Sequence, residues 1–567
     1  KKEKQMESFS RAHKGRLAIR AFKVIADAMV IRGNYKPSGT SGQALEMALR
    51  DLSPEIYGTM NDPRSIEIKG LEYILDRLPR GIEECTRIVL TAHEAFENTS
   101  FEKIQPNKRR RLSYRVSENE MCFVITTGLS EIYDVLTHIT FLNIEAGKIF
   151  QHMKESSGDY TSGWKDLERI TSREDTLTDR QLDQAIWNLS IFLGRTYQET
   201  KDTYAYLDEN RKSCGCNNSL FQIIYRMGKR VERENACRDD ELLIYFTPSL
   251  QSMIGHHRYG PQWAWNVKNK LCEIGLKNRP LHIISANMHS VVNLLYGYAA
   301  ACADSQEKPD GDLYRFLQNS RDKGEMIKAY AVANGFHDVP DTSEMLIHAQ
   351  IIDMAQLDQL MFHPDLHLER QNLKSTKPVL LVIDYAFGTQ AYEVMDEILS
   401  QFHQKPGIQV CSISIMGKAG ILPGGKGDIM LPTAHVMEGT PHNYLVQNDM
   451  EKTDFDDSVD VYVGPIVTVL GTSLQNRDVL EKFQTTSWKA IGLEMEGGHY
   501  HRAISAAIIR GHISPDIKLR YAYYASDNPM LSGQTLASGS MGDEGIKPTY
   551  MITKVIVEKI VNSSNPQ

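Results

Sequence analysis

From about residue 371 to the C-terminus, short apolar runs alternate with longer amphipathic segments. The stretch KSTKPVLLVIDYAFGTQAYEVMDEILSQF (374–402) predicts a strand, a glycine turn and an amphipathic helix, the first unit of a βα fold. Further strands are expected over residues 409–415, 428–431, 461–470, 490–493 and 519–525, and further helices over residues 476–483 and 498–510. This alternation predicts a three-layer α/β/α domain with a largely parallel sheet, in which ligands bind at the carboxyl ends of the strands.

The region before residue 371 has apolar side chains mostly at helical spacing. Helices are expected over residues 17–31, 71–78, 132–149 and 182–193. Two short apolar runs, at residues 242–246 and 281–284, predict buried strands, and the second leads into an expected helix over residues 288–303.

These patterns suggest three parts. We expect a mainly α-helical domain over residues 1–235, a mixed α/β or helical segment over residues 236–370, and the α/β domain over residues 371–567. Such a division agrees with the roughly 100 to 200 residues that domains usually have.

Composition narrows the class of partner. The net charge is −8, and nucleic-acid binders usually carry a basic excess, so we expect a small-molecule partner and no nucleic acid. Eight cysteines are spread thinly, unlike a secreted disulfide framework. The chain shows neither a signal-peptide pattern nor an apolar run long enough to span a bilayer, so a cytoplasmic location without membrane contact is expected.

Four segments of the last part carry residues suited to chemistry. In GTQAYEV (388–394), a glycine turn after a strand places Glu393 one turn into a helix. The glycine-rich stretch 417–428 is expected between two strands, where small residues let a ligand approach the main chain. GLEMEGG (492–498) sets two carboxylates at a strand-to-helix junction, and ASDNP (525–529) ends a strand.

Each segment also has an ordinary structural interpretation. A glutamate at a helix start often only satisfies the helix dipole, and Ser-Asp-Asn-Pro is often a turn or cap. His256-His257 lacks a spaced carboxylate or third histidine in the sequence, so a loop or packed histidine is expected there, and no metal site is predicted. The ordered series of four segments favours a joint function.

In this order, the segments resemble the nucleoside phosphorylase/nucleosidase superfamily over about residues 376–560. GKAGILPGGKGDIMLP (417–432) is similar to its G-x-A-G-x-L…G-D-I signature, GLEMEGG to its E-M-E motif, and SDNP to its S-D motif. Within the superfamily, the chain resembles the hydrolytic branch of methylthioadenosine/S-adenosylhomocysteine nucleosidase and AMP nucleosidase; the run MLSGQTL (530–536) is closest to the latter. The resemblance implies a nucleoside-phosphorylase-type C-terminal domain that hydrolyses the N-glycosidic bond of a purine nucleoside or nucleotide.

The resemblance also implies roles for particular residues. Asp527, beside Ser526, would donate a proton to N7 of the leaving purine. Glu496 would bind the ribose hydroxyls, and Met495 would pack against the sugar. Glu393, five positions after the glycine of its turn, would activate the attacking water, as in inverting glycoside hydrolysis. The remaining residues expected to bind substrate are Gly388, Gly417, Lys418, Ala419, Gly420, Leu474 and Glu494.

Two of these positions leave alternatives open. Lys418 stands where the nucleosidases usually carry a small residue, and it would bind a nucleotide's 5′-phosphate, a co-substrate phosphate, or only solvent. The loops that carry phosphate-binding arginines in phosphorylases contain none here, which favours water as the nucleophile. Leu474 lies in GTSLQ (471–475), where the family's base-contacting G-D-x-F segment stands without its Asp and Phe. Adenine is therefore only a family-level expectation.

The sequence is compatible with three functions. The first is a purine nucleoside or nucleotide N-glycosidase that needs no metal or redox cofactor. The second is a phosphate-dependent purine nucleoside phosphorylase, and the third is a nucleotide-binding sensor or scaffold with little turnover. The resemblance further implies a homo-oligomer, either a dimer or a hexamer, whereas residues 1–370 show no motif with a recognisable chemistry.

Overall fold

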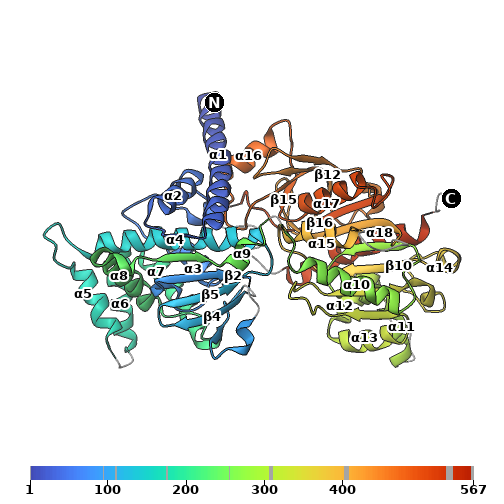
Figure 1. Ribbon diagram of the computed structural model, residues 1–567, viewed down its shortest axis with the longest axis horizontal. Coiled ribbons are helices and arrows are strands. Elements are labelled where there is room, and N and C mark those ends of the chain that lie inside the picture. The colour runs from blue at the N-terminus through green and yellow to red at the C-terminus, as the bar shows by residue number, and fades with distance from the viewer. Residues whose placement is uncertain are drawn as a thin grey trace. The chain divides into compact units, whose positions relative to one another are not determined.

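The structure is a computed structural model that describes residues 2–92, 95–108, 111–173, 177–254, 256–305, 311–400, 408–531 and 541–563. The chain forms two compact units. The first contains residues up to Ile125, Glu131–His256 and Ser473–Val479; the second contains Thr126–Ser130, His257–Thr472 and the chain from Leu480 onward (Figure 1). Part of the MLSGQTL run, residues 532–536, lies outside the described residues.

The first unit is built on a six-stranded sheet. Its strands, in spatial order, are β1 (Asn34–Tyr35), β6 (Leu243–Phe246), β2 (Arg87–Thr91), β5 (Glu120–Val124), β4 (Leu112–Ser117) and β3 (Glu102–Ile104). β2 runs parallel to both of its neighbours, β5 and β6. This sheet corrects the expectation of a mainly helical domain: the predicted strand at residues 242–246 is confirmed as β6, but β1 to β5 were not predicted.

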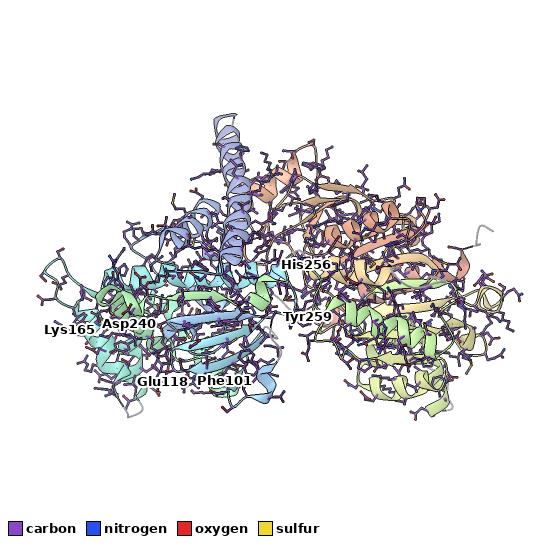
Figure 2. All side chains as sticks on the ribbon, in the orientation of Figure 1. Phe101, Glu118, Lys165, Asp240, His256 and Tyr259 are labelled. Carbon is purple, nitrogen blue, oxygen red and sulfur yellow. A yellow bond between two sulfur atoms is a disulfide. The ribbon has the colours of Figure 1, made fainter. Side chains whose placement is uncertain are left out.

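Helices of this unit agree better with the sequence pattern. They are α1 (Lys2–Arg32), α2 (Thr40–Leu52), α3 (Ile68–Leu75), α4 (Leu129–Met153), α5 (Ser162–Thr171), α6 (Asp179–Leu193), α7 (Tyr197–Ser213), α8 (Leu220–Ala236) and α9 (Pro248–Gln251). The helices predicted over residues 17–31, 132–149 and 182–193 are confirmed within α1, α4 and α6, and the one predicted over residues 71–78 overlaps α3, which ends at Leu75. Their buried positions recur at helical spacing, and in each unit side chains fill the space between helices and strands (Figure 2).

The second unit contains a ten-stranded sheet. Along its main path the strands are β13 (Asn443–Leu445), β12 (Ile429–Met437), β14 (Val461–Thr468), β15 (Gly492–Glu494), β11 (Val410–Ile421), β7 (Leu281–Ser285), β10 (Val379–Ile383), β9 (Ala349–Asp353) and β8 (Phe336–Val339). The tenth strand, β16 (Lys518–Asp527), pairs with both β11 and β12. The strands predicted from the alternating pattern are all present near their expected positions.

Five of these strands close into a ring. β11 pairs with β16, β16 with β12, β12 with β14, β14 with β15, and β15 with β11. The β11–β15 and β12–β16 pairings are antiparallel, as are those of the outer strands β8, β9 and β13. The expected largely parallel sheet is therefore corrected to a mixed sheet that is partly closed on itself.

Helices pack against this sheet, and the core lies between them and the strands. They are α10 (Gly260–Glu273), α11 (Ser290–Ser305), α12 (Leu313–Asn319), α13 (Gly324–Val332), α14 (Arg370–Thr376), α15 (Gln390–Leu399), α17 (Gly497–Ile509) and α18 (Ile546–Asn562). α18 contacts β11, β16 and α11, whereas α17 contacts β12, β14 and α15. α16 (Arg477–Thr485) begins in the segment that belongs to the first unit.

The division between units differs from the expected one. β7, predicted as part of a separate segment before residue 371, pairs in parallel with both β10 and β11. The second unit therefore begins near His257, and residues 236–370 supply helices and strands to both units. A strand's pattern indicates its burial but not the sheet that it joins.

Two further observations concern the helices and the cysteines. Among the described residues, each helix is too short or too polar to cross a membrane. Cys214 and Cys216 are joined by a disulfide, which the thin spread of cysteines gave no reason to expect.

Candidate functional site

Strand ends converge at Gly420 in the ring of strands. Gly420 pairs with β15 and, after a register shift between Ala419 and Gly420, with Asp527 of β16. A Cβ atom on Gly492 of β15 would lie 2.6 Å from the carbonyl oxygen of Gly420, so glycine permits this close approach. One expectation is corrected: residues 417–420 lie inside β11 rather than between two strands.

Glu494 is a buried carboxylate at the end of β15. It accepts hydrogen bonds from the hydroxyl of Thr468 and from the backbone N–H groups of Glu496 and Gly497. Burial raises the pKa of Glu494 to about 7, although these three donors favour the charged form. Glu494 therefore fixes the turn that presents Met495 and Glu496.

Glu496 reaches back to the turn after β10. Its Oε1 accepts a hydrogen bond from the N–H of Gly388 at 2.8 Å. Gly388 has a φ of +53°, and a Cβ atom there would lie 2.2 Å from Oγ of Ser130, so the turn requires glycine. The same Oγ accepts the N–H of Thr389 at 2.9 Å, and the terminal methyl of Met495 lies 3.7 Å from the Cβ position of Gly388. Gly388, Met495 and Glu496 thus form one contact group.

A second contact group lies where β16 ends beside β11. Asp527 is only 5% exposed. Oγ of Ser526 lies 2.9 Å from Oδ1 of Asp527 and 3.3 Å from the carbonyl oxygen of Ala419, and the hydroxyl donates to these acceptors. Nδ2 of Asn528 donates to two carbonyl oxygens of the loop after β11. Because Gly420 of β11 pairs with β15 as well as β16, the strand ends that carry the two contact groups flank the same residue of β11.

Glu393 has a different set of partners. It lies in the first turn of α15, and its Oε1 accepts the N–H of Gly260, the first residue of α10, at 2.8 Å. Burial raises the pKa of Glu393, and the Gly260 N–H and the nearby His257 oppose that rise. Within the described residues, the hydrogen bonds of Glu393 run to the start of α10, whereas those of Glu496 and Asp527 run to the two groups above.

His257 lies beside two carboxylates that its sequence neighbourhood does not reveal. Ligand atoms of His257, Asp396 and Glu397 lie within 4.8 Å of one another, a spacing that suits a divalent cation. However, Nδ1 of His257 is 2.6 Å from Glu397, and Arg510 donates to Asp396 at 2.8 Å. Burial lowers the pKa of His257, but the hydrogen bond to Glu397 and the surrounding carboxylates outweigh burial and raise it. The cluster is thus charge-balanced without an ion.

Two further residues predicted to bind substrate are Lys418 and Leu474. Lys418 is exposed and stands in register with Tyr524 of β16. Leu474 is buried in the segment Ser473–Val479, which belongs to the first unit. Next to it, the carbonyl oxygen of Gln475 accepts the N–H of Glu55 at 3.0 Å. Residues 473–475 of the expected base-contacting segment therefore belong to the first unit, whereas Gly471 and Thr472 belong to the second.

A large cavity of the second unit was not predicted. Its volume is about 680 Å³, and the described residues that line it include none of the residues expected to bind or turn over substrate. Asn287 and His289, which line it, directly follow β7. The rule that ligands bind at the carboxyl ends of strands would have pointed to them, had β7 been assigned to this sheet.

Comparison with solved structures finds distant similarities. The chain is similar to the 5′-methylthioadenosine/S-adenosyl homocysteine nucleosidase of Campylobacter jejuni, at 10% identity and a TM-score of 0.29, covering 50% of this chain and 100% of that one. It is also similar to futalosine hydrolase of Helicobacter pylori (11%, TM-score 0.28, 50% and 99%) and to uridine phosphorylase of Schistosoma mansoni in complex with uracil (12%, TM-score 0.29, 52% and 89%). Likeness at this level does not determine the chemistry.

Sequence comparison gives the family. No curated protein matches the sequence. A family model described as a family of unknown function, DUF6909, matches residues 43–307 and 312–562, and so spans most of both units. The chain therefore belongs to the DUF6909 family.

Proposed function

We propose that the chain hydrolyses the N-glycosidic bond of a purine nucleoside or nucleotide. One observation carries the proposal: segments that resemble nucleosidase motifs and are far apart in sequence come together in the second unit. Three of them lie on or directly after β15, β11 and β16 of the ring, in which β11 pairs with the other two, and the turn after β10 is hydrogen-bonded to Glu496. Gly388 donates to Glu496 across 108 positions, and Asp527 pairs with Gly420 of the glycine-rich strand.

Asp527 is the proposed general acid. Its position at a strand end, 5% exposed and 2.9 Å from the Ser526 hydroxyl, suits a group that exchanges a proton with a bound base. Protonation of N7 lets the purine leave as a neutral molecule while the electron pair of the C1′–N9 bond remains on the base. Proton donation of this kind contributes on the order of 10² to 10⁴ in rate.

Glu496 is the proposed ligand of the ribose hydroxyls. One of its oxygens is oriented by the Gly388 N–H, and the buried Glu494 fixes the turn on which it stands. A carboxylate held in this way offers charge-assisted hydrogen bonds to two neighbouring hydroxyls. Met495, in the same contact group, supplies an apolar surface for the sugar.

Glu393 is the proposed base on the strength of the motif alone. In the hydrolytic step, water adds its oxygen to C1′ and gives one proton to Glu393, while Asp527 gives one proton to N7. Both carboxyl groups return to their starting states by exchange with solvent. For this role the Glu393 carboxylate must serve water through the oxygen that does not accept the Gly260 N–H.

Phosphorolysis requires a cation at the nucleophile. Lys418 is the lysine proposed for it, and the side chain is exposed rather than held in a pocket, so hydrolysis is the better supported reaction. Comparing products with and without phosphate separates the two reactions: hydrolysis releases free ribose, whereas phosphorolysis releases ribose 1-phosphate.

A binding protein with little turnover is the second candidate function. One observation favours it: Oε1 of Glu393 accepts the N–H of Gly260 at the start of α10. This would leave a purine ligand bound without an efficient base.

The decisive experiment is a chromatographic screen for free base released from AMP, adenosine, methylthioadenosine, S-adenosylhomocysteine, inosine and guanosine. Asp527→Asn should lower kcat on the active substrate by about 10² to 10⁴-fold with little change in binding, because the amide cannot donate an acidic proton. The matched control is Asp516→Asn, an exposed aspartate outside both contact groups. Absence of base release from every substrate, with tight binding retained, would establish the second candidate instead.

A further inference from the structure

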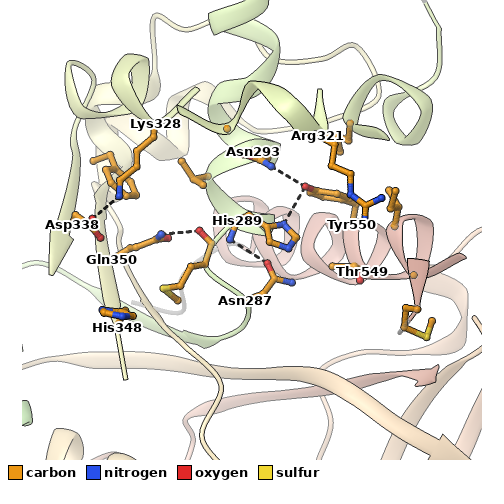
Figure 3. A pocket seen from close by; sticks show the side chains of 18 of the residues that line it. Asn287, His289, Asn293, Arg321, Lys328, Asp338, His348, Gln350, Thr549 and Tyr550 are labelled. Carbon is orange, nitrogen blue, oxygen red and sulfur yellow. Dashed lines mark hydrogen bonds and ion pairs between the residues drawn. The ribbon is translucent and has the colours of Figure 1, made fainter. Parts of the chain in front are cut away.

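Three helices begin at the cavity of about 680 Å³ in the second unit. His289 precedes the first residue of α11, Gly324 is the first residue of α13, and Ile546 is the first residue of α18; all three line the cavity (Figure 3). The first N–H groups of a helix have no partner within it, and the helix dipole makes this end positive. The start of α11 is capped by Asn287, whose Oδ1 accepts the N–H groups of His289 and Ser290, whereas no side chain among the described residues caps the start of α13 or α18. Helix starts of this kind attract anions.

Two cations at the cavity can also donate to an anion. Arg321 and Lys328 line it, and so does one carboxylate, Asp338. Lys328 is 2.6 Å from Asp338, and Arg321 is 2.8 Å from Asp543, which is 69% exposed. Both cations are about half exposed, so each has N–H groups available beside its ion pair. Each cation is therefore charge-balanced by its partner, and the two offer an incoming anion their remaining N–H groups rather than a net positive charge.

Two histidines add neutral donors. Nδ1 of His348 accepts the N–H of Asp341 at 3.2 Å, so a neutral ring carries its proton on Nε2. Asn293 donates to the hydroxyl of Tyr550 at 3.1 Å, and that hydroxyl lies 3.4 Å from Nδ1 of His289 (Figure 3). Burial and Arg321 lower the pKa of His289, which keeps its ring neutral. These groups are donors suited to phosphate or hydroxyl oxygens.

Gln350 offers a ligand a hydrogen-bond acceptor, in contrast to the donors above. Its side chain is only 5% exposed and lines the cavity. Nε2 donates to the carbonyl oxygen of Met288 at 2.7 Å, while Oε1 is buried without a hydrogen-bond partner among the described residues (Figure 3). An unpaired buried acceptor costs free energy until a donor reaches it. A ligand with an N–H or O–H group would provide that donor.

We propose that this cavity binds a phosphate monoester whose organic part carries hydroxyl groups, such as a sugar phosphate. The phosphate lies at Arg321 and the start of α18, and the organic part extends toward Lys328 on the opposite side of the cavity, where a hydroxyl donates to Oε1 of Gln350 (Figure 3). This site is separate from Asp527 and Glu496, which do not line the cavity, and the proposal stands whether or not the chain is a nucleosidase.

The test is calorimetric titration of ribose 5-phosphate, ribose and inorganic phosphate into the full chain. Ribose 5-phosphate should bind more tightly than either fragment. Arg321→Met with Lys328→Met should weaken its binding by about tenfold or more, since hydrogen bonds to charged groups are lost. Gln350→Met should weaken ribose 5-phosphate but leave inorganic phosphate unchanged, because only the sugar reaches Gln350.

Controls separate this site from others and from misfolding. The double variant Arg510→Met with Lys374→Met removes an ion-paired arginine and lysine of similar exposure outside the cavity and should bind normally. Asp527→Asn with Glu496→Gln should also bind normally. Lys328→Met alone provides a milder variant, and thermal unfolding checks each fold. Unchanged binding in the cavity variants, loss of binding in the Asp527 and Glu496 variant, or no binding at all would overturn the proposal.

Discussion

Glu494 combines deep burial with three hydrogen-bond donors, and its carboxyl group responds to both. Burial disfavours the charged form by removing water, while Thr468 and the two backbone N–H groups favour it. Burial dominates, so the pKa rises from 4.5 to about 7. A group with a raised pKa in the folded state stabilises the fold most when it is protonated in both states, and that contribution is lost as the pH rises through the folded pKa.

Replacement of Glu494 by Gln should remove this pH dependence. Between about pH 4.5 and 7, the wild-type protein should lose on the order of 1 to 3 kcal/mol of unfolding free energy relative to Glu494→Gln, because only the wild type must ionise a buried group. Urea unfolding at several pH values measures the difference. Comparison with the variant is essential, since burial also raises the pKa of Glu145 in the first unit to about 7. A constant difference across this range would contradict the assignment.

For Glu393, the sequence predicts a catalytic base, whereas the structure shows a hydrogen bond to the start of α10. Its position five residues after Gly388 suggested a base only through the resemblance to the nucleosidases. Spacing does not fix which neighbour a side chain contacts, and α10, which comes from residues before 371, supplies its partner.

The variant Glu393→Gln distinguishes the two roles. Gln keeps an oxygen that accepts the Gly260 N–H, so stability should change by less than about 1 kcal/mol. If Glu393 is the base, kcat should fall by about 10²-fold or more, since the amide cannot take a proton from water. Single-turnover base release measures this. Full activity with wild-type stability would leave Glu393 only a partner of α10.

At the scale of elements, the ring of strands depends on bridging side chains as well as ladders. β12 and β16 pair only at two positions, Ile429 with Tyr524 and Met430 with Tyr523. Beyond them Asn448 continues the connection: Nδ2 donates to the carbonyl oxygen of Tyr521 at 2.8 Å, and Oδ1 accepts the N–H of Tyr521 at 3.1 Å. The side chain thus takes the place of a strand neighbour.

Asn448→Ala should therefore destabilise the second unit by about 2 kcal/mol, because two backbone groups of β16 lose their partner. Hydrogen exchange should show faster opening in β16, including the end that carries Asp527. The matched control is Asn443→Ala on the exposed strand β13. Equal effects of the two substitutions would show that the Asn448 bridge adds nothing specific.

Elements were predictable where the pattern was long or regular. The alternation after residue 371 predicted the strands and helices that carry the contact groups, because parallel strands are apolar throughout and helices are amphipathic. β3 and β4 were missed since they are short and carry polar residues on one face. The closure of the ring was not predictable, because pairing between β11 and β15 depends on two small residues, Gly420 and Gly492, that come close only in three dimensions.

At the scale of the whole molecule, residues that are consecutive in sequence do not always belong to the same unit. Thr126–Ser130 belongs to the second unit, and Ser473–Val479 belongs to the first. No local pattern indicates either exchange, and Leu474, which the resemblance predicts to bind substrate, lies in the second of these segments. Ser130 also explains how the first third of the chain supports the Gly388 turn.

Asn476 provides the test of this exchange. Nδ2 donates to the carbonyl oxygens of Leu52 (2.9 Å) and Ser53 (3.2 Å), and Oδ1 accepts the N–H of Val479. Asn476→Ala should cost about 1 to 3 kcal/mol and speed hydrogen exchange at the end of α2, although it changes a residue more than 400 positions away. Asn269→Ala, an exposed asparagine bonded within its own helix, is the control. No change at α2 would argue against the assignment of this segment to the first unit.

The closed ring also governs how the second unit meets other chains. A strand with neighbours on both sides offers no free backbone donors or acceptors, so the main path of this sheet ends only at β13 and β8. These edge strands have three and four residues, and β8 carries His337 and Asp338 at its centre. Short, polar borders resist strand addition, the route by which sheets merge into aggregates. Any self-association of this unit would accordingly use its helices and loops.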